Sequence, residues 1–380
     1  MLDTATLARS AAHRRVRLVA RKAPLFTSKA LDEVANGRLS VEATPLRPTN
    51  SFTLRGVRMR AAAFALMLVV CGVTTARAAA PMVKTQPGFY RVMVGDFQIT
   101  ALDDGVVSYR ATRVLPDATP KQIKDNLMGS GLSLEMSYNA YLVNTGSKLI
   151  LIDTGTGGKL EDEPEFHGAG RLMANLRAAG YQPGQVDEVY ITHRGQDHIG
   201  GLTIGRERAF PNALVRASKS EMDIFLDPAK TAALLAAAHN DEKVKAWIQF
   251  TQDLFTPYIR VGRFQPFDGD ITLVPGIRAL ATPGHTPGHT SYVVQSKGQT
   301  LIVMGDLVLV AALQFPYPSL GSSFDADPKA AVEQRIRVFR MASDGDYWVA
   351  GGHISFPGIG HIRAGNDRYF WIPADYTLPQ

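Results

Sequence analysis

Short apolar runs rich in β-branched residues recur along the chain from about residue 88 onwards. Such runs, bounded by Gly, Pro, Asn and Asp, are typical of strands buried in a sheet. Several of them end directly at a polar motif, which places reactive side chains at the edges of the sheets. The pattern predicts strands over residues 97–102, 140–143, 149–152, 186–192, 213–217, 271–274, 277–281, 290–294, 300–304 and 347–350.

Three longer segments between these runs have the spacing of apolar residues that predicts helices. The first, 171–179, stops at Gly180, a residue suited to the left-handed turn that ends many helices. The other two cover residues 228–255 and 329–341. Strands and helices therefore alternate in two β-rich halves. This order suits an α/β fold of four αββα layers in one domain over residues 79–380, although the pattern also fits other α/β folds.

Residues 60–80 have the organisation of a secretory signal peptide. Arginines precede an apolar run over 61–73, and a small-residue cleavage site follows at 76–78. The run is shorter than the roughly 20 residues that a membrane span needs. We expect a Sec-type signal peptide over 59–78 and a periplasmic or secreted mature protein with no stable membrane span. An uncleaved anchor and a lipoprotein modified at Cys71 are the alternatives.

The 58 residues ahead of this signal are rich in Arg, Ala, Ser and Thr and have no sustained apolar period. We expect residues 1–58 to be disordered, or to lie ahead of a true start at Met59. They also dominate the charge: residues 1–78 carry 13 Lys/Arg and 4 Asp/Glu, a net charge of +9, so the whole-chain value of +6 leaves −3 for the remainder. The domain itself is not basic, and we expect no nucleic-acid partner.

Four polar motifs, each at the end of a predicted strand, carry the candidate chemistry. They are THRGQDHIGG over 192–201, TPGHTPGHT over 282–290, Gly305-Asp306, and GGH over 351–353. Imidazole and carboxylate together suit Zn²⁺, Mn²⁺, Fe²⁺ or Co²⁺. A carboxylate at the end of a strand as apolar as the one before Asp306 is costly to bury unless it is paired or bound to a metal. The candidate metal ligands are His193, Asp197, His198, His285, Asp306 and His353.

This series of motifs resembles that of the metallo-β-lactamase superfamily, whose early Asp-Thr-Gly element is matched by Asp153 in LIDTG. Longer strings resemble one branch, methyl parathion hydrolase. They include YLVNTGSK over 141–148, AGYQP over 179–183 and SFPGIGHIR over 355–363. The resemblance implies a four-layer αββα metallo-β-lactamase sandwich and a metal-dependent hydrolase.

The resemblance also implies a binuclear site in which the protein ligands divide into two groups. Asp306 would bridge the two ions, and Asp153 would orient the first motif from behind. Asp197 and Asp306 are therefore the candidate catalytic carboxylates. His193 and His285 would hold the first ion, and Asp197, His198 and His353 the second.

A hydroxide held by the metals would be the nucleophile, because metal binding lowers the pKa of water towards neutrality. The substrate would be a small molecule, either an organophosphate triester with an aryl leaving group or a lactone or aryl ester. By resemblance, Phe166, Phe225 and Trp247 lie near an aromatic pocket over the metals, although an ordinary core would accommodate them equally. A homodimer is compatible with the sequence.

The first motif departs from the family pattern HxHxDH, because Gly195 stands at its third position. Glycine has no side chain, so the first ion lacks one protein ligand. Arg194 cannot donate a lone pair, and Gln196 should project differently from the missing histidine unless the loop bends. We hypothesise one well-held ion and one weak or water-completed ion, with zinc as the expected metal and Mn, Fe or Co as alternatives. The competing function is a metal-binding protein whose catalysis is impaired by Gly195.

Other histidines and one acidic run carry less weight. His289, four residues after His285, is interpreted as structural, and His361 as a hydrogen-bonded structural residue. His167 and His239 are expected to be solvated. The acidic run over 161–165 is expected to be an exposed loop or a lid beside the site.

Overall fold

The computed structural model describes residues 82, 86–127, 133–159 and 168–376. From residue 86 onwards these belong to one compact unit, Val83–Gln380. The predictions for the leader (1–58), the signal peptide (59–78), the acidic run (161–165) and Phe166 lie outside the described residues. Within the described part of the chain, no helix combines the length and the apolar character that a membrane crossing requires.

Two mixed sheets form the centre of this unit, and each contains one parallel pair that matters for the site. In the first sheet β4 and β5 are parallel, and in the second β12 and β13 are parallel. The first sheet has the order β1 (Phe89–Val94), β2 (Phe97–Arg110), β3 (Ser133–Asn144), β4 (Leu149–Ile152), β5 (Glu188–Tyr190) and β8 (Leu214–Arg216). The second has the order β15 (Tyr369–Pro373), β14 (Ile359–Ala364), β13 (Trp348–Ala350), β12 (Gln299–Val303), β11 (Thr290–Ser296), β10 (Ile277–Ala281) and β9 (Ile271–Val274).

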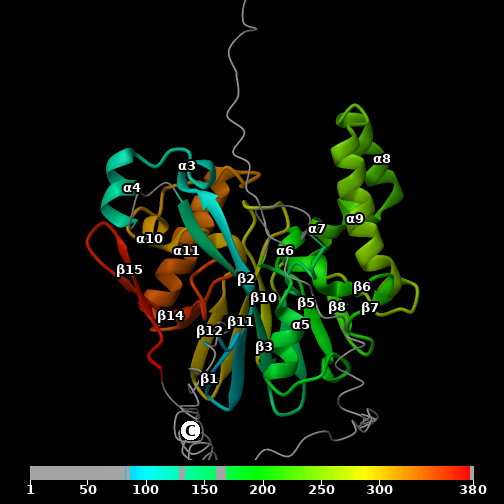
Figure 1. Cartoon of the computed structure of the whole chain (residues 1–380), viewed down its shortest axis with the longest axis horizontal. Helices are drawn as coiled ribbons and strands as arrows, with labels where there is room; N and C mark the ends of the chain where they lie inside the picture. Colours follow the sequence, from blue (N-terminus) through cyan, green and yellow to red (C-terminus); the bar gives the residue numbers. More distant parts are fainter. Residues whose placement is uncertain (1–81, 83–85, 128–132, 160–167, 377–380) are drawn as a thin grey trace, which may run out of the picture. The chain divides into compact units, whose positions relative to one another are not determined.

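The helices cover the outer faces of the two sheets (Figure 1). On the first sheet they include α5 and α9, and on the second α11. A small hairpin of β6 (Thr203–Ile204) and β7 (Glu207–Arg208) lies apart from both sheets. The helices are α3 (Ala111–Val114), α4 (Pro120–Asn126), α5 (Leu172–Ala178), α6 (Gln196–Ile199), α7 (Lys219–Leu226), α8 (Pro228–Ala237), α9 (Glu242–Ile259), α10 (Ala311–Gln314) and α11 (Pro328–Asp344), with the short 3₁₀ turns η2 (Pro183–Gln185), η3 (Gly200–Leu202) and η4 (Gly305–Leu307).

Three apolar layers hold these elements together, which is the αββα arrangement expected from the sequence. The layer between the sheets joins side chains such as Ile150 of β4 to Leu301 of β12. In the same layer the rings of Tyr190 and Tyr292 stack 5.4 Å apart, and the Tyr292 hydroxyl donates to the Ile191 carbonyl at 2.6 Å. Because both faces of each sheet are covered, the central strands are continuously apolar rather than alternating, as in the LILI of β4.

The segment 228–255, expected to be largely helical, contains two helices, α8 and most of α9. His239 and Asn240 have φ values of 50° and 56°, which end α8. Asp241 then begins α9 by accepting hydrogen bonds from the backbone N–H groups of Lys243 and Val244. The sequence pattern remained helical throughout because both helices share the same apolar spacing. In Figure 1, α8 and α9 project together beyond the sheets.

Several elements were not predicted at all. The strands β1, β14 and β15 and the helices α4 and α7 are absent from the expectations, and β2 and β3 are much longer than the predicted 97–102 and 140–143. The extended part of this hairpin alternates buried and exposed residues and carries charged side chains, so its apolar run is interrupted. Pairing between β2 and β3 over its full length, from Gln98–Asn144 to Arg110–Ser133, supplies the missing stabilisation.

Candidate metal centre

The six predicted ligands lie together at one edge of the two sheets, where strands end. His193 follows β5, and Asp197 and His198 lie on α6. His285 lies between β10 and β11, and His353 follows β13. Asp306 lies in η4 directly after β12, and the residue before it, Gly305, has a φ of 58° that a glycine adopts without strain. Because β4–β5 and β12–β13 run parallel, their carboxyl ends bring these loops to the same edge.

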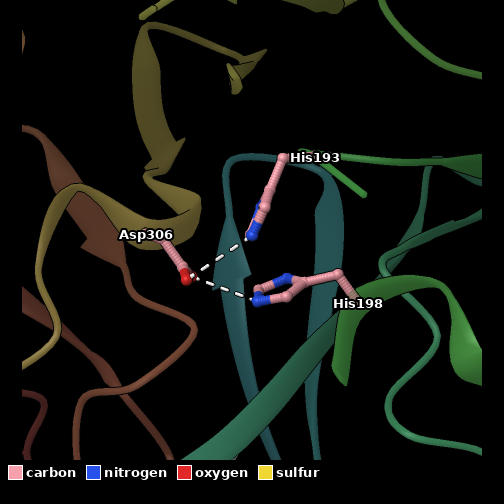
Figure 2. Close-up of side chains that lie close together, drawn as sticks. All are labelled: His193, His198 and Asp306. Atoms are coloured by element: carbon pink, nitrogen blue, oxygen red, sulfur yellow. Dashed lines mark ion pairs between the residues drawn. The ribbon is translucent and has the colours of Figure 1, made fainter. Parts of the chain in front are cut away.

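Asp306 lies at the centre of the cluster. Its Oδ2 atom is 3.1 Å from His353 Nε2, 3.3 Å from His285 Nε2 and 3.6 Å from His193 Nε2. Its Oδ1 atom is 3.2 Å from His198 Nε2. Figure 2 shows Asp306 facing His193 and His198, which come from the opposite sheet. The carboxylate to which the resemblance assigns a bridging role therefore lies close to all four histidines.

Asp197 completes a second group on one side of this centre. Its Oδ2 atom lies 3.4 Å from His353 Nε2 and 3.5 Å from His198 Nε2. Asp197, His198 and His353 have ligand atoms close enough to share one ion, and so do His193, His198 and Asp306. The cluster thus offers the nitrogen and oxygen ligands that a divalent ion needs.

A partner on Nδ1 fixes the orientation of three of the histidine rings. His198 Nδ1 donates to Asp153 at 2.8 Å, and His353 Nδ1 donates to the Ser137 carbonyl at 3.1 Å. His285 Nδ1 donates to Asp325 at 2.9 Å. When each ring is neutral, these contacts place its proton on Nδ1 and leave a lone pair on Nε2, the atom that faces the centre, which is the arrangement by which proteins hold metal-binding histidines.

Burial and charge make the centre suited to a cation. Two buried atoms in it, His198 Nε2 and Asp306 Oδ1, have no hydrogen-bond partner. Burial would raise the pKa of Asp306, but the neighbouring histidines, His353 foremost, hold that pKa well below its usual range. Burial would lower the pKa of His198, but Asp306, Asp197 and Asp153 raise it well above 6.5. A divalent ion would fit between these groups. It would replace the proton on His198 and would give both His198 Nε2 and Asp306 Oδ1 a partner.

Asp325 was not identified from the sequence, although it holds His285. Its side chain is fully buried, and its Oδ2 atom accepts from the Ser322 backbone N–H at 2.7 Å. It stands two residues before Asp327, which caps α11, so in the sequence it resembles one more polar residue at a helix start. Only the packing of this loop against His285 reveals its role.

We expect the substitution Asp325→Ala to weaken metal binding about 10–100-fold, the usual effect of losing a carboxylate that orients a histidine ligand. The measurement is a calorimetric titration of the metal-free protein with zinc. Asp327→Ala is the matched control, because it removes a helix cap two residues away, costs about 1 kcal/mol of stability and contacts no ligand. Equal affinities in both variants would contradict this role for Asp325.

The remaining histidines differ in what they do. His289 Nε2 accepts from the Asp306 backbone N–H at 3.0 Å, and burial lowers the pKa of His289 to about 3. It therefore positions the Asp306 loop as a neutral ring, in agreement with a structural residue. The expectation of a hydrogen-bonded His361 is wrong: its Nδ1 makes no hydrogen bond, and its ring packs on Trp348 with centroids 4.1 Å apart. His239 is exposed at the end of α8, and His167 lies outside the described residues.

Gly195 begins α6 with φ −52° and ψ 140°, a conformation open to any residue. A Cβ atom built there would lie 2.6 Å from His193 Nε2, 2.9 Å from His198 Cδ2 and 3.0 Å from Asp197 Oδ1. The third position of the motif thus points into the cluster, as the resemblance requires. In the binuclear arrangement that the resemblance implies, His193, His285 and Asp306 would be left to hold the first ion.

A cavity of about 500 Å³ opens over this centre. Trp247, on α9, lines it, as expected, but Phe225, on α7, instead lines a separate cavity of about 210 Å³. The remaining wall of the larger cavity is largely aromatic and apolar and includes Tyr109, Met136, Tyr138, Leu309 and Phe324. Burial and the nearby Asp197 raise the pKa of Tyr138, so its hydroxyl stays protonated.

The family is decided by the match of residues 135–353 to the model of the metallo-beta-lactamase superfamily, a span that contains all six ligands. The chain belongs to the metallo-beta-lactamase superfamily. This result confirms the resemblance and the fold class at the level of the superfamily. The narrower resemblance to methyl parathion hydrolase stays a prediction.

Individual relatives and solved structures are also similar to this chain. A crystal structure described as the hydrolase AbOPH is 33% identical with a TM-score of 0.69, covering 78% of this chain and 100% of its own. The dizinc quorum-quenching lactonase AidC is 27% identical with a TM-score of 0.67, covering 77% and 99%. An N-acyl homoserine lactonase from Bacillus sp. is 27% identical over 181 residues, which are 44% of this chain and 62% of that relative. The chain thus spans less than two thirds of the length of the curated lactonases that it matches.

Proposed function

We propose that this member of the superfamily is a metal-dependent hydrolase that acts on a small-molecule lactone or aryl ester. The observation that carries the proposal is the convergence of four histidine Nε2 atoms on Asp306, with three of the rings oriented by partners behind them. A bound divalent ion would polarise the scissile oxygen and lower the pKa of water near it. The protein's own contribution is to hold the ionised carboxylates, orient the rings and shape the cavity.

The lactone is the favoured substrate class because the relatives include N-acyl homoserine lactonases and a structure with the product N-hexanoyl-L-homoserine bound. An organophosphate triester with an aryl leaving group is a second candidate. The cavity wall of Tyr109, Tyr138, Trp247 and Phe324 supports it, since aromatic side chains suit a flat apolar leaving group. Both reactions develop negative charge on an oxygen, so one centre can serve both.

Zinc is the proposed metal, because the ligands are four imidazoles and two carboxylates and the neighbour AidC is described as a dizinc protein. We propose unequal occupancy of the two positions. Asp197, His198, His353 and Asp306 form a complete protein ligand set for one ion. The other ion has two histidines and the shared Asp306, since Gly195 offers no side chain.

Hydrolysis by the purified protein tests the proposal. Dihydrocoumarin, N-hexanoyl homoserine lactone and a paraoxon-like triester are assayed with and without a chelator, followed by addition of zinc. We expect turnover of at least one lactone, loss of that turnover with chelator and its return with zinc. Chelator-insensitive or absent turnover on all three substrates, in a protein that still binds zinc, would favour the metal-binding protein without efficient catalysis.

A further inference from the structure

Arg194 is a buried cation in the middle of the metal-binding loop. It directly follows the ligand His193, and its side chain is only 18% exposed. It lies on the wall shared by the metal cavity and the smaller cavity between α7 and α9. Arginine is rarely buried to this extent without a partner, so its surroundings require an explanation.

The Arg194 guanidinium lies over two aromatic rings. Its Cζ atom is 4.4 Å from the centroid of Phe225 and 4.1 Å from that of Trp247. Stacking of this kind stabilises the cation and holds the planar group in one orientation. The guanidinium N–H donors lie in the plane of the group, so contact with the rings does not use them.

The nearest carboxylate, Glu221, forms an ion pair with this group but accepts no hydrogen bond from it. Its Oε1 atom is 3.8 Å from Arg194 Nε, beyond hydrogen-bonding distance. Glu221 instead accepts from the backbone N–H groups of Arg194 at 3.1 Å and Gly288 at 2.9 Å, and so joins the two histidine-bearing loops. No hydrogen bond joins the guanidinium to any residue in the described part of the chain. A preorganised cation with open donors beside a catalytic cavity fits an anionic oxygen group.

We propose that Arg194 determines substrate specificity by binding a carboxylate of the substrate. The preferred substrate would then be an ester or lactone that carries a carboxylate at the end of a short carbon chain. This inference rests on the proposed hydrolase function and names the substrate class of the same site. Arg194 presents its Nη donors as a fork that matches the two oxygens of a carboxylate. The apolar wall of the smaller cavity, with Ile224, Leu234 and Val244, accommodates the carbon chain beside it.

A matched pair of esters tests the proposal. Mono(4-nitrophenyl) adipate carries a carboxylate, and its methyl ester has the same 4-nitrophenyl ester and carbon chain but replaces that carboxylate with an uncharged methyl ester. With the zinc-loaded wild type we expect kcat/KM to be about tenfold or more higher for the charged ester, mainly through KM, as for a hydrogen bond to a charged group. The preference should shrink with added salt. Arg194→Gln should remove it, and Arg194→Lys should keep part of it because the charge remains but the fork is lost.

Arg208→Gln is the matched control, because Arg208 also lies over an aromatic ring, that of Tyr258, but does not line either cavity. It should leave the preference unchanged. Equal kcat/KM values for the two esters in the wild type would overturn the proposal, and so would an equal loss for both esters in Arg194→Gln, which would indicate a purely structural residue.

A binding measurement separates this inference from the hydrolase function. Trp247 stacks on Arg194, so a ligand at the guanidinium should change tryptophan emission. If neither ester is hydrolysed, the proposed function fails for such esters, and the zinc-loaded protein is titrated with monomethyl adipate and with dimethyl adipate. A change with the carboxylate alone, lost in Arg194→Gln, would support the proposal. The same response to both compounds, or none to either, would overturn it.

Discussion

Replacing Asp306 with alanine is expected to abolish tight metal binding and, with it, metal-dependent hydrolysis. The carboxylate lies within 3.6 Å of the Nε2 atoms of all four histidines, so no other side chain can compensate for its loss. Losing a carboxylate that only orients a metal ligand lowers metal affinity or activity about 10–100-fold. Because Asp306 would bind the metal directly, its loss should lower metal affinity by more than about 100-fold. Removing the anion also leaves the cluster with less negative charge to balance a divalent ion.

The measurement combines metal content after dialysis with the kcat/KM of the substrate that the wild type turns over. Asp306→Asn keeps the size of the side chain but removes its charge, and it should lose nearly as much as alanine if charge is the cause. Asp227→Ala is the control, because this residue caps α8 outside the metal cavity. Retention of wild-type zinc affinity in Asp306→Ala would remove Asp306 from the metal centre.

Gly195→His is expected to raise the zinc stoichiometry after dialysis from about one to about two equivalents. The backbone at this position already suits any residue, and the Cβ atom would point at His193, Asp197 and His198. The atoms that it would meet at 2.6–3.0 Å belong to side chains and not to the backbone, and these side chains must shift to admit a new ring. An imidazole there would give the first ion a third histidine, and we expect its affinity to rise on the order of 10–100-fold.

The substitution Gly195→Ala separates the ligand from the steric effect. It adds the same Cβ atom without a nitrogen, so it should not strengthen zinc binding at the position held by His193 and His285. It should reduce zinc occupancy there if the Cβ atom displaces His193. The stoichiometry is measured on protein dialysed against metal-free buffer. Two tightly held equivalents in the wild type, or an equal gain in the alanine variant, would contradict the account of the incomplete site.

Local sequence signals were sufficient for much of the fold. The strand 149–152 and the strands 271–274 and 277–281 have the predicted bounds, because each is a short β-branched run between turn residues. The helix predicted over 171–179 ends where Gly180 takes a φ of 88°. These features depend on interactions within a few residues, which a sequence displays directly.

Elements stabilised by distant partners were not visible in this way. The length of the β2–β3 hairpin depends on pairing across the chain, and the division of α8 from α9 depends on two residues with positive φ. The spacing of apolar residues in the sequence indicates which face of a helix or strand is apolar. It does not report where a partner strand ends or where a backbone turns.

The sequence by itself determined the set of candidate ligands, the order of their motifs along the strands and the absence of a side chain at residue 195, because these are matters of residue type and spacing. Only the tertiary structure decided which atoms meet. Asp325 behind His285 is 40 residues away in sequence, and Glu221 reaches Gly288 across 67. Arg194 contacts the rings of Phe225 and Trp247, which come from two other helices, and the sequence does not show these contacts. Contacts between segments far apart in the chain are set by the packing of the two sheets and their helices, and that packing is a property of the whole fold rather than of any one motif.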